Sequence, residues 1–448
     1  MKKVKVMFAS FPDFSSNAKP LYLYMKNKYG DNLELSWAVN DISVKENLKS
    51  KGIITYHIGT EEYFSYAKDV DIFFTTHCNI LGEKNEKSIY AELWHGIGPK
   101  NLGYLTDNMN ENDKNWYEFI SRNVDYVITP SDFWRVIFST EFNIEYSRTL
   151  NFAYPKLDFF AYSNGKENLE KVTNLNLDKY KKIIFYMPTF RKGCDREQES
   201  SLNQNNIFNL EQYPEEKLID FLKKNNYLLC IKKHPSEELN TVDLQNENIK
   251  VIHEDDLTNN SITINEILNA SDLMITDYSS LGTEYLFLNK PIIYINTDSE
   301  EYSKNRGIIF GNSDFWMIGD KVHQIDEMLN SIDKALKSDY KPSEEYLQKR
   351  KLWFGNLNDG GCENICRYFF DGYKLNKNLV RHVDSVKRYK DRVDEISKVL
   401  DEKNEVIADR ENRIKELDLF ISNIINSKGW KFLEKIRGVK KVFNKKNK

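Results

Sequence analysis

Four short segments of the chain bring together side chains that can transfer a proton or bind an anion. They are 94–100 (WHGIGPK), 188–191 (PTFR), 232–235 (KKHP) and 276–280 (TDYSS). An imidazole can act as a general base near neutral pH, and Lys and Arg bind phosphate oxygens. Cations, a base and an anion site together suit the attack of a hydroxyl on a diphosphate.

The first segment places His95 between Trp94 and Gly96, with Lys100 downstream. Glycines let a backbone approach a ligand closely, which would suit a substrate site. An isolated His is more often structural, so this segment alone leaves a base and a structural residue equally open.

The second and third segments carry positive charge after predicted strands. Arg191 and a following helix N-terminus would suit a phosphate, and Lys232, Lys233 and His234 would make a local positive site. Each segment taken alone also fits an ordinary solvated turn.

The fourth segment precedes a helix predicted at 281–288. Ser279, Ser280 and the free N–H groups of that helix would cradle an anion, and Asp277 would hold a ligand hydroxyl. The alternative is that Asp277 or a Ser simply caps the helix. The sequence contains no zinc-ligand pattern, phosphate-binding GxxxxGK loop or acidic metal triad, so we expect neither a metal nor a cofactor.

These segments need strands to position them, and the chain alternates short apolar runs with polar helical stretches. This alternation predicts an α/β fold with parallel sheets, in two Rossmann-like doubly wound domains at 1–160 and 181–372 that face a cleft. The acceptor side is assigned to the first domain and the nucleotide donor to the second. Predicted strands lie at 4–9, 33–39, 53–57, 70–75, 124–129, 183–187, 227–231, 250–252, 272–276 and 291–295.

Two further segments follow the α/β body. Apolar residues recur every seven positions between 376 and 426, which predicts a C-terminal α-helical coiled coil and homo-oligomers, with a solvated single helix as the alternative. The tail 427–448 is basic with one apolar helical face. It is typical of a segment that binds an anionic membrane surface, although it could instead pack on the body.

Composition narrows the class of protein. The net charge of −4 argues against a nucleic-acid-binding protein. Five scattered Cys predict reduced thiols, and the sequence shows no signal peptide and no apolar run of membrane-spanning length. We therefore expect a cytoplasmic protein, peripheral on the inner face of the cell membrane.

Together the segments carry a family resemblance. WHGIGPKNLG, FYMPTFR, KKHP, ITDYSSLGTEYLFLNKPIIY and the later Asp-Gly at 359–360 occur in this order. They resemble the CDP-glycerol glycerophosphotransferases of teichoic acid and capsule synthesis over about residues 1–370. The resemblance implies a GT-B-like fold and a CDP-polyol donor. It also implies transfer of glycerol phosphate, or a related polyol phosphate, to an acceptor hydroxyl with release of CMP.

The same resemblance implies roles for particular residues. His95 would be the catalytic base and His234 the second catalytic His, at the donor phosphate. The donor-binding residues would be Arg191, Lys233, Asp277, Tyr278, Ser279, Ser280 and Glu284, and the acceptor-side residues Trp94, Gly96 and Lys100.

The sequence departs from the family pattern on the acceptor side. Residues 97–99 (IGP) stand between Gly96 and Lys100, and 153–158 reads AYPKLD where the family has GYPRND. No Pro-Gly element follows Gly307. The polyol and the acceptor, a lipid-linked polyol phosphate or saccharide, therefore stay open. Two other hypotheses are a GT-B glycosyltransferase that uses a nucleotide sugar and a non-enzymatic membrane-tethered scaffold.

Overall fold

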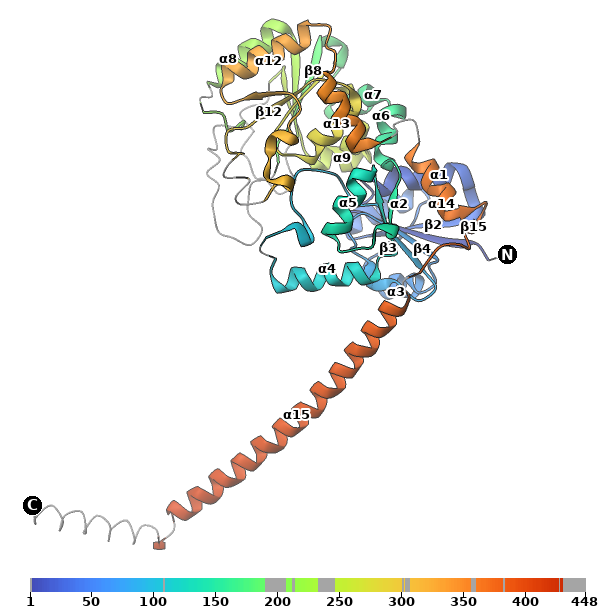
Figure 1. Cartoon of the computed structure of the whole chain (residues 1–448), viewed down its shortest axis with the longest axis vertical. Coiled ribbons are helices and arrows are strands. Elements are labelled where there is room, and N and C mark those ends of the chain that lie inside the picture. The colour runs from blue at the N-terminus through green and yellow to red at the C-terminus, as the bar shows by residue number, and fades with distance from the viewer. Residues whose placement is uncertain are drawn as a thin grey trace, which may run out of the picture. The chain divides into compact units, whose positions relative to one another are not determined.

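The computed structural model describes most of the chain (Figure 1). The described residues are 2–107, 109–189, 207–211, 214–232, 246–299, 302, 307–355, 360–381, 383–426 and 428–429; for 383–398, 424 and 425 only the backbone is described. The chain divides into two units, Met1–Val383 and Asp384–Lys448.

The first sheet has seven parallel strands in the order β3-β2-β1-β4-β5-β6-β7. Most side chains of these strands are apolar, so the strands lie in the core. For example, Phe8 of β1 pairs with Trp37 of β2 on one side and Phe74 of β4 on the other. The strands are β1 (Val4–Ala9), β2 (Leu33–Val39), β3 (Ile54–His57), β4 (Ile72–Thr75), β5 (Ile89–Glu92), β6 (Tyr126–Thr129) and β7 (Thr149–Asn151). The sequence analysis missed β5 and β7, which are only four and three residues long.

The second sheet has six parallel strands in the order β10-β9-β8-β11-β12-β13. They are β8 (Lys182–Met187), β9 (Tyr227–Lys232), β10 (Ile249–Ile252), β11 (Leu273–Thr276), β12 (Ile292–Ile295) and β13 (Asp320–Val322). The prediction missed β13, a three-residue edge strand with two charged residues. An α/β fold with parallel sheets is thus confirmed.

Helices cover both sheets. On the second sheet α8 and α12 lie side by side (Figure 1) and bury Leu222 and Ile332 against alternate strand residues such as Ile184. The helices before α15 are α1 (Ala18–Tyr29), α2 (Ile42–Ser50), α3 (Glu61–Ala67), α4 (Glu111–Asn123), α5 (Asp132–Glu141), α6 (Asp158–Tyr162), α7 (Gly165–Thr173), α8 (Glu215–Asn225), α9 (Glu254–Asn260), α10 (Ser280–Tyr285), α12 (Ile325–Lys337), α13 (Glu344–Phe354) and α14 (Gly361–Phe369).

A single apolar core joins the first sheet to the inner face of the second. Phe185 and Met187 of β8 belong to the same buried cluster as Phe8 and Phe74. Because strand side chains alternate between faces, the residues between them, such as Ile184, belong to the other cluster under α8 and α12.

Helix α14 returns to the first sheet although it follows the second sheet in sequence. Phe369 packs edge-on against Phe74 and Tyr126, with ring centres 5.3 Å and 5.5 Å away. The backbone amides of Gly361 and Cys362 donate to the Asp158 carboxylate at the start of this helix. Residues that precede the second sheet in the sequence and residues that follow it therefore pack together to complete the first sheet.

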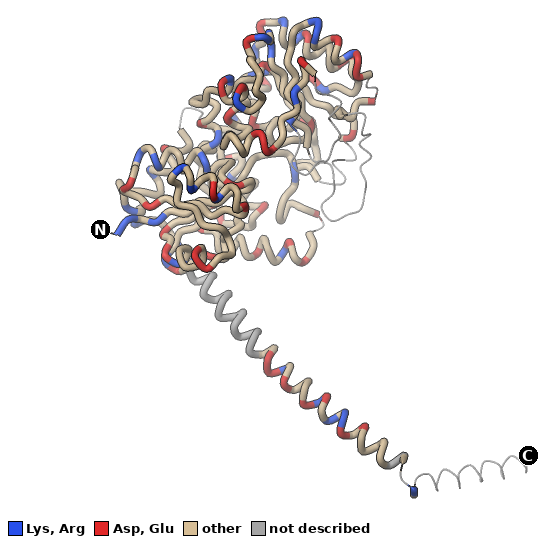
Figure 2. The backbone as a smooth tube through the Cα atoms, turned by 180° about the vertical axis from the view of Figure 1, so that it is seen from behind, with Lys and Arg blue, Asp and Glu red and all other residues tan. Residues whose placement is uncertain are grey.

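Helix α15 (Val383–Asn426) carries the predicted heptad segment as one helix of 44 residues. Figure 2 shows acidic and basic residues interspersed along its described part. Its pairing into a coiled coil stays a prediction. Within the described residues, no helix has the length and apolarity needed to cross a membrane. The tail 427–448 lies outside the described residues except at 428 and 429.

Candidate active site

Each sheet has one place where the strand order reverses, between β1 and β4 in the first and between β8 and β11 in the second. Ligands of doubly wound sheets bind beyond the carboxyl ends of the strands at this place. In the second sheet, the Thr189 backbone amide donates to Asp277 Oδ1 over 2.8 Å, which joins the ends of β8 and β11. In the first sheet, Thr76 and His77 follow β4 directly.

The buried carboxylate of Glu92 organises the end of the first sheet. It accepts hydrogen bonds from the Thr75 hydroxyl (2.6 Å), the Cys78 amide (2.9 Å) and the Trp94 amide (2.9 Å). Burial raises the pKa of Glu92, and these donors act in the opposite direction. Sequence analysis missed this residue; an acid that ends a strand directly before the WHG segment was the available signal.

Asn17 and Trp94 hold the segment that carries His95. The Asn17 side-chain amide donates to the carbonyls of Leu93 (3.1 Å) and Trp94 (2.8 Å). Trp94 has a positive φ of 54°, an unfavourable conformation for a residue with a side chain, and its ring packs edge-on against Phe142. Trp94, expected on the acceptor side, is therefore largely buried and positions its neighbour.

The His95 ring contacts two other aromatic rings. The His77 ring stacks on it at 4.3 Å and 11°. The Trp94 ring lies 4.3 Å from His95, tilted by 40°, and 6.4 Å from His77, so it lies beside the stacked pair rather than on the face opposite His77. His95 Nδ1 is 3.4 Å from the Thr76 carbonyl oxygen, which can only accept, so Nδ1 carries the hydrogen and Nε2 has the free lone pair.

The surroundings of His95 favour its neutral form. Its pKa lies well below the usual value because protein atoms pack around the ring, and the positive charges near it, His77 when protonated, Lys156 and Lys100, act in the same direction. The side chain is nevertheless exposed to solvent. A neutral imidazole with an accessible lone pair can accept a proton from a hydroxyl.

The glycines of the first segment bring the two sheets together. A Cβ on Gly96 would lie 3.1 Å from Glu284 Oε1, and one on Gly98 would lie 3.2 Å from Ser280 Cβ. The Cβ positions of these glycines face α10, so packing against this helix also requires glycine, and their role toward a ligand stays a prediction. The loop after β5 and the segment after β11 form one site.

Lys156 and Glu284 form a buried ion pair beneath this junction. Lys156 Nζ also donates to the His95 carbonyl oxygen over 2.8 Å. Burial raises the pKa of Glu284, and the Lys156 charge opposes that effect. In the sequence, Lys156 stands out only as a departure from the family pattern.

Residues of the fourth segment, 276–280, make contacts that stabilise the fold. Ser279 caps α10 by accepting from the Leu281 amide over 3.3 Å. Tyr278 is buried, donates its hydroxyl to Asn296 Oδ1 (3.0 Å) and stacks on Tyr302 with ring centres 4.0 Å apart. The helix begins at Ser280 and continues as a 3₁₀ turn at Leu286–Leu288.

The segment around Lys100 also spans the two sheets. Lys100 pairs with Ile308 in an isolated antiparallel bridge, and the Ile309 amide donates to the Pro99 carbonyl over 2.7 Å. A small cavity here is lined by Pro99, Asp277 and Ser279, together with Ile308 and Trp316.

Three predicted site residues, Arg191, Lys233 and His234, lie outside the described residues. Within the described part of the chain, no cluster of three or more His, Cys, Asp or Glu side chains is placed to hold a metal ion.

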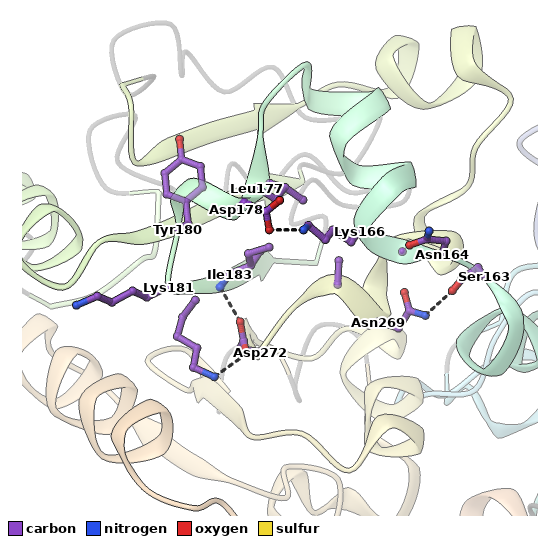
Figure 3. Close-up of a pocket in the computed structure, with 13 residues that line it drawn as sticks. Ser163, Asn164, Lys166, Leu177, Asp178, Tyr180, Lys181, Ile183, Asn269 and Asp272 are labelled. Carbon is purple, nitrogen blue, oxygen red and sulfur yellow. Dashed lines mark hydrogen bonds and ion pairs between the residues drawn. The ribbon is translucent and has the colours of Figure 1, made fainter.

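A cavity of about 460 Å³ lies at the opposite, amino-terminal edge of the second sheet (Figure 3). Asp272 there pairs with Lys182 and accepts from the Ile183 amide, and Lys166 pairs with Asp178. This cavity is therefore separate from the candidate active site.

A neutral His beyond the strand ends, where two parallel sheets meet, suits a group-transfer enzyme in which a base takes the proton of a hydroxyl. The family model described as CDP-glycerol:poly(glycerophosphate) glycerophosphotransferase matches residues 1–371. The chain therefore belongs to this family of transferases.

Known relatives agree with this assignment. The chain is 28% identical over 315 residues to a teichoic acid glycerol-phosphate primase of Bacillus subtilis (strain 168), covering 66% of this chain and 75% of that protein. It is 24% identical to a teichoic acid glycerol-phosphate transferase of Staphylococcus aureus (strain NCTC 8325 / PS 47), covering 82% and 92%. It is 26% identical to a teichoic acid poly(ribitol-phosphate) polymerase of Bacillus spizizenii (strain ATCC 23059 / NRRL B-14472 / W23). That match covers 82% of this chain but just over half (56%) of the polymerase.

The fold also has a solved counterpart. The structure of the wall teichoic acid polymerase TagF superposes with a TM-score of 0.63 at 21% identity, covering 82% of this chain and 88% of that chain.

The contact between the glycine loop and α10 can be tested with Gly98→Ala. The new Cβ would lie 3.3 Å from the Ser280 backbone Cα, so the loop and α10 must move apart by a few tenths of an ångström. We expect CMP release from CDP-glycerol to fall about tenfold because the two halves of the site lose their alignment.

Gly82→Ala is the matched control, because a Cβ at Gly82 would have no atom within 4 Å. Thermal denaturation should show both variants folded. Normal turnover of Gly98→Ala would contradict a functional contact at this position.

Proposed function

We propose that this chain transfers glycerol phosphate from CDP-glycerol to a hydroxyl of a teichoic-acid-like or capsular polymer and releases CMP. The observation that carries the proposal is the meeting of the His95 loop with α10 through Gly96 and Gly98. It brings a neutral base from one sheet to the segment of the other that the family resemblance assigns to the donor.

In the proposed reaction His95 acts through Nε2. It takes the proton of the acceptor hydroxyl while that oxygen bonds to the phosphorus attached to glycerol. The bond from this phosphorus to the bridging oxygen breaks, and CMP leaves with the electron pair. The lowered pKa keeps the His95 ring neutral, so Nε2 can accept a proton, although it also makes the imidazole a weaker base than one with an ordinary pKa.

The donor would lie at the ends of β8 and β11. Ser280 and Asp277 belong to described segments there, and Arg191, Lys233 and His234 are assigned to the diphosphate by the family resemblance alone. Tyr278 and Glu284 would act indirectly, because Tyr278 is buried and Glu284 is paired with Lys156.

The finer architecture is also a proposal. We infer a GT-B-like arrangement in which the first sheet presents the acceptor side, with Lys100 near it, and the second presents the donor. The acceptor would be a lipid-linked polyol phosphate or saccharide at the inner face of the membrane.

Replacing His95 tests the proposed base. In His95→Asn we expect kcat for CMP release to fall by about 10² to 10⁴, since general base catalysis contributes about this factor, while CDP-glycerol binding changes little. Turnover is measured with labelled CDP-glycerol and binding by calorimetry. Turnover close to wild type would refute the assignment.

His323→Asn is the matched control, because His323 is exposed and follows an edge strand of the second sheet. Offering CDP-ribitol and UDP-sugars in the same assay separates the proposal from a glycosyltransferase. Release of UDP, with no CMP formed from either CDP-polyol, would favour the glycosyltransferase.

We further propose that α15 associates with α15 of other copies. Its described apolar side chains include Leu400, Ile407, Ile414 and Ile421, which recur every seven residues and are half-exposed or more. Such a stripe is typical of a coiled-coil seam. A coiled-coil seam also has an apolar residue three positions after each of these. Lys403 and Arg410 occupy two of those positions, and their charges would restrict the register of the helices or the number of copies.

A double variant tests this self-association. Ile407→Lys with Ile414→Lys should convert the protein to a monomer, because buried charge opposes helix pairing. Sedimentation equilibrium measures the mass. Glu405→Lys with Asn412→Lys, at the same spacing off the seam, should keep the wild-type mass. A monomeric wild type at micromolar concentration would contradict the proposal.

The tail 427–448 is proposed to bind anionic lipid. Phe432, Ile436, Val439 and Phe443 have a spacing that would place them on one face of a helix, and Lys and Arg are frequent in this segment. Chains ending at 426 should lose co-sedimentation with phosphatidylglycerol vesicles, and the full chain should bind these but not phosphatidylcholine vesicles. Equal binding by both chains would count against the tail.

A further inference from the structure

His77 is a second imidazole at the site that the proposed reaction does not use. It follows β4, one strand away from the strand that carries His95, and its ring lies parallel to that of His95 at 4.3 Å and 11°. Sequence analysis did not single it out. The signal was available, because His77 also follows the end of a buried strand.

Four rings form a cluster at the end of the first sheet. Phe11 lies edge-on against His77 at 5.8 Å, His77 lies parallel to His95, and Trp94 contacts His95 at a tilt of 40° from beside the stacked pair. His77 thus covers one face of the His95 ring.

Thr76 orients both imidazoles from one residue. Its hydroxyl is 2.8 Å from His77 Nδ1, and its carbonyl oxygen is 3.4 Å from His95 Nδ1. The two ring planes are therefore set by the same residue, which is itself fully buried.

We propose that His77 is a positioning residue for His95, which covers one face of the imidazole and fixes its plane. This inference rests on the proposed role of His95 as the base. Without His77, water would reach that face, and the imidazolium form of His95 would be better solvated.

The other charges around the two imidazoles would stay in place when His77 is removed. Lys156 binds the His95 carbonyl oxygen and pairs with Glu284, Lys100 lies on the same loop, and Glu92 binds the Trp94 amide. Burial also lowers the pKa of His77 to about 4, with Lys156 as the second cause, so His77 is itself neutral in the working range. The expected effect of His77 is therefore mainly to exclude water rather than to add charge.

The pH profile gives the direction of the effect. Activity needs neutral His95, so it is lost as the pH falls through the His95 pKa. In the wild type this loss lies well below pH 6.5 because the pKa is lowered. In His77→Ala we expect the pKa to rise toward its ordinary value of about 6.5, so that kcat/KM at pH 6 falls relative to pH 8 by up to about fourfold, the limit that a full return would give.

The experiment compares kcat/KM from pH 5 to 9 for the wild type, His77→Ala, His77→Phe and His323→Ala. His77→Phe keeps a flat ring over His95 and should retain the wild-type acid limb. His323→Ala is the exposed control. An unshifted acid limb in His77→Ala, or a shift of equal size in His323→Ala, would overturn the proposal.

An NMR titration of His95 with ¹⁵N-labelled histidine separates this inference from the proposed function. If the wild type releases no CMP, the proposed function fails, and the titration still tests whether His77 lowers the His95 pKa. An unchanged His95 titration in His77→Ala refutes the inference. If His77→Ala does not fold by thermal denaturation, His77→Gln takes its place in both measurements.

Discussion

The buried pair of Lys156 and Glu284 is the interaction on which the site depends. Lys156 follows the first sheet and Glu284 lies on α10 of the second, so the pair fixes the two sheets relative to each other. Removing one partner of such a pair leaves an unpaired buried charge, which costs several kcal/mol. Because Lys156 also binds the His95 carbonyl oxygen, loss of the pair would also displace the backbone that carries the proposed base.

The hydrogen bonds around His95 form a second level of control. Glu92 joins the loops after β4 and β5, and Asn17 holds the carbonyl groups on either side of the turn at Trp94. These groups are buried and polar, and satisfying them requires one backbone path. The unfavourable φ of Trp94 is held in place by this network, which fixes the backbone that carries His95.

The sequence was sufficient to predict the α/β class, ten of the strands and the positions of the site segments after strand ends. Long apolar runs such as 33–39 produce a strong signal, whereas Thr149–Asn151 and Asp320–Val322 are short strands that form because neighbouring strands pair with them. The sequence could not predict Glu92, Lys156 or His77 as site residues. Their roles come from contacts between distant segments, such as that of Lys156 with Glu284, and no local pattern encodes such contacts.

The glycines of the first segment illustrate the same limit. Their spacing indicated a close approach of the backbone, and that is correct, but the partner is Ser280 and Glu284 of the other sheet. A single sequence contains no information on which surface fills such a space. The residues at 97–99 that differ from the family pattern lie at this contact, so they alter the junction of the sheets as well as the acceptor side.

The return of α14 to the first sheet has a consequence for synthesis of the chain. Phe369 closes a core that begins with Phe8 and Phe74, and the whole second sheet is made between them. As the chain leaves the ribosome from its N-terminus, the first sheet emerges with this apolar surface uncovered. It stays uncovered until translation has passed α14, so the half of the enzyme that is made first is the half that is completed last.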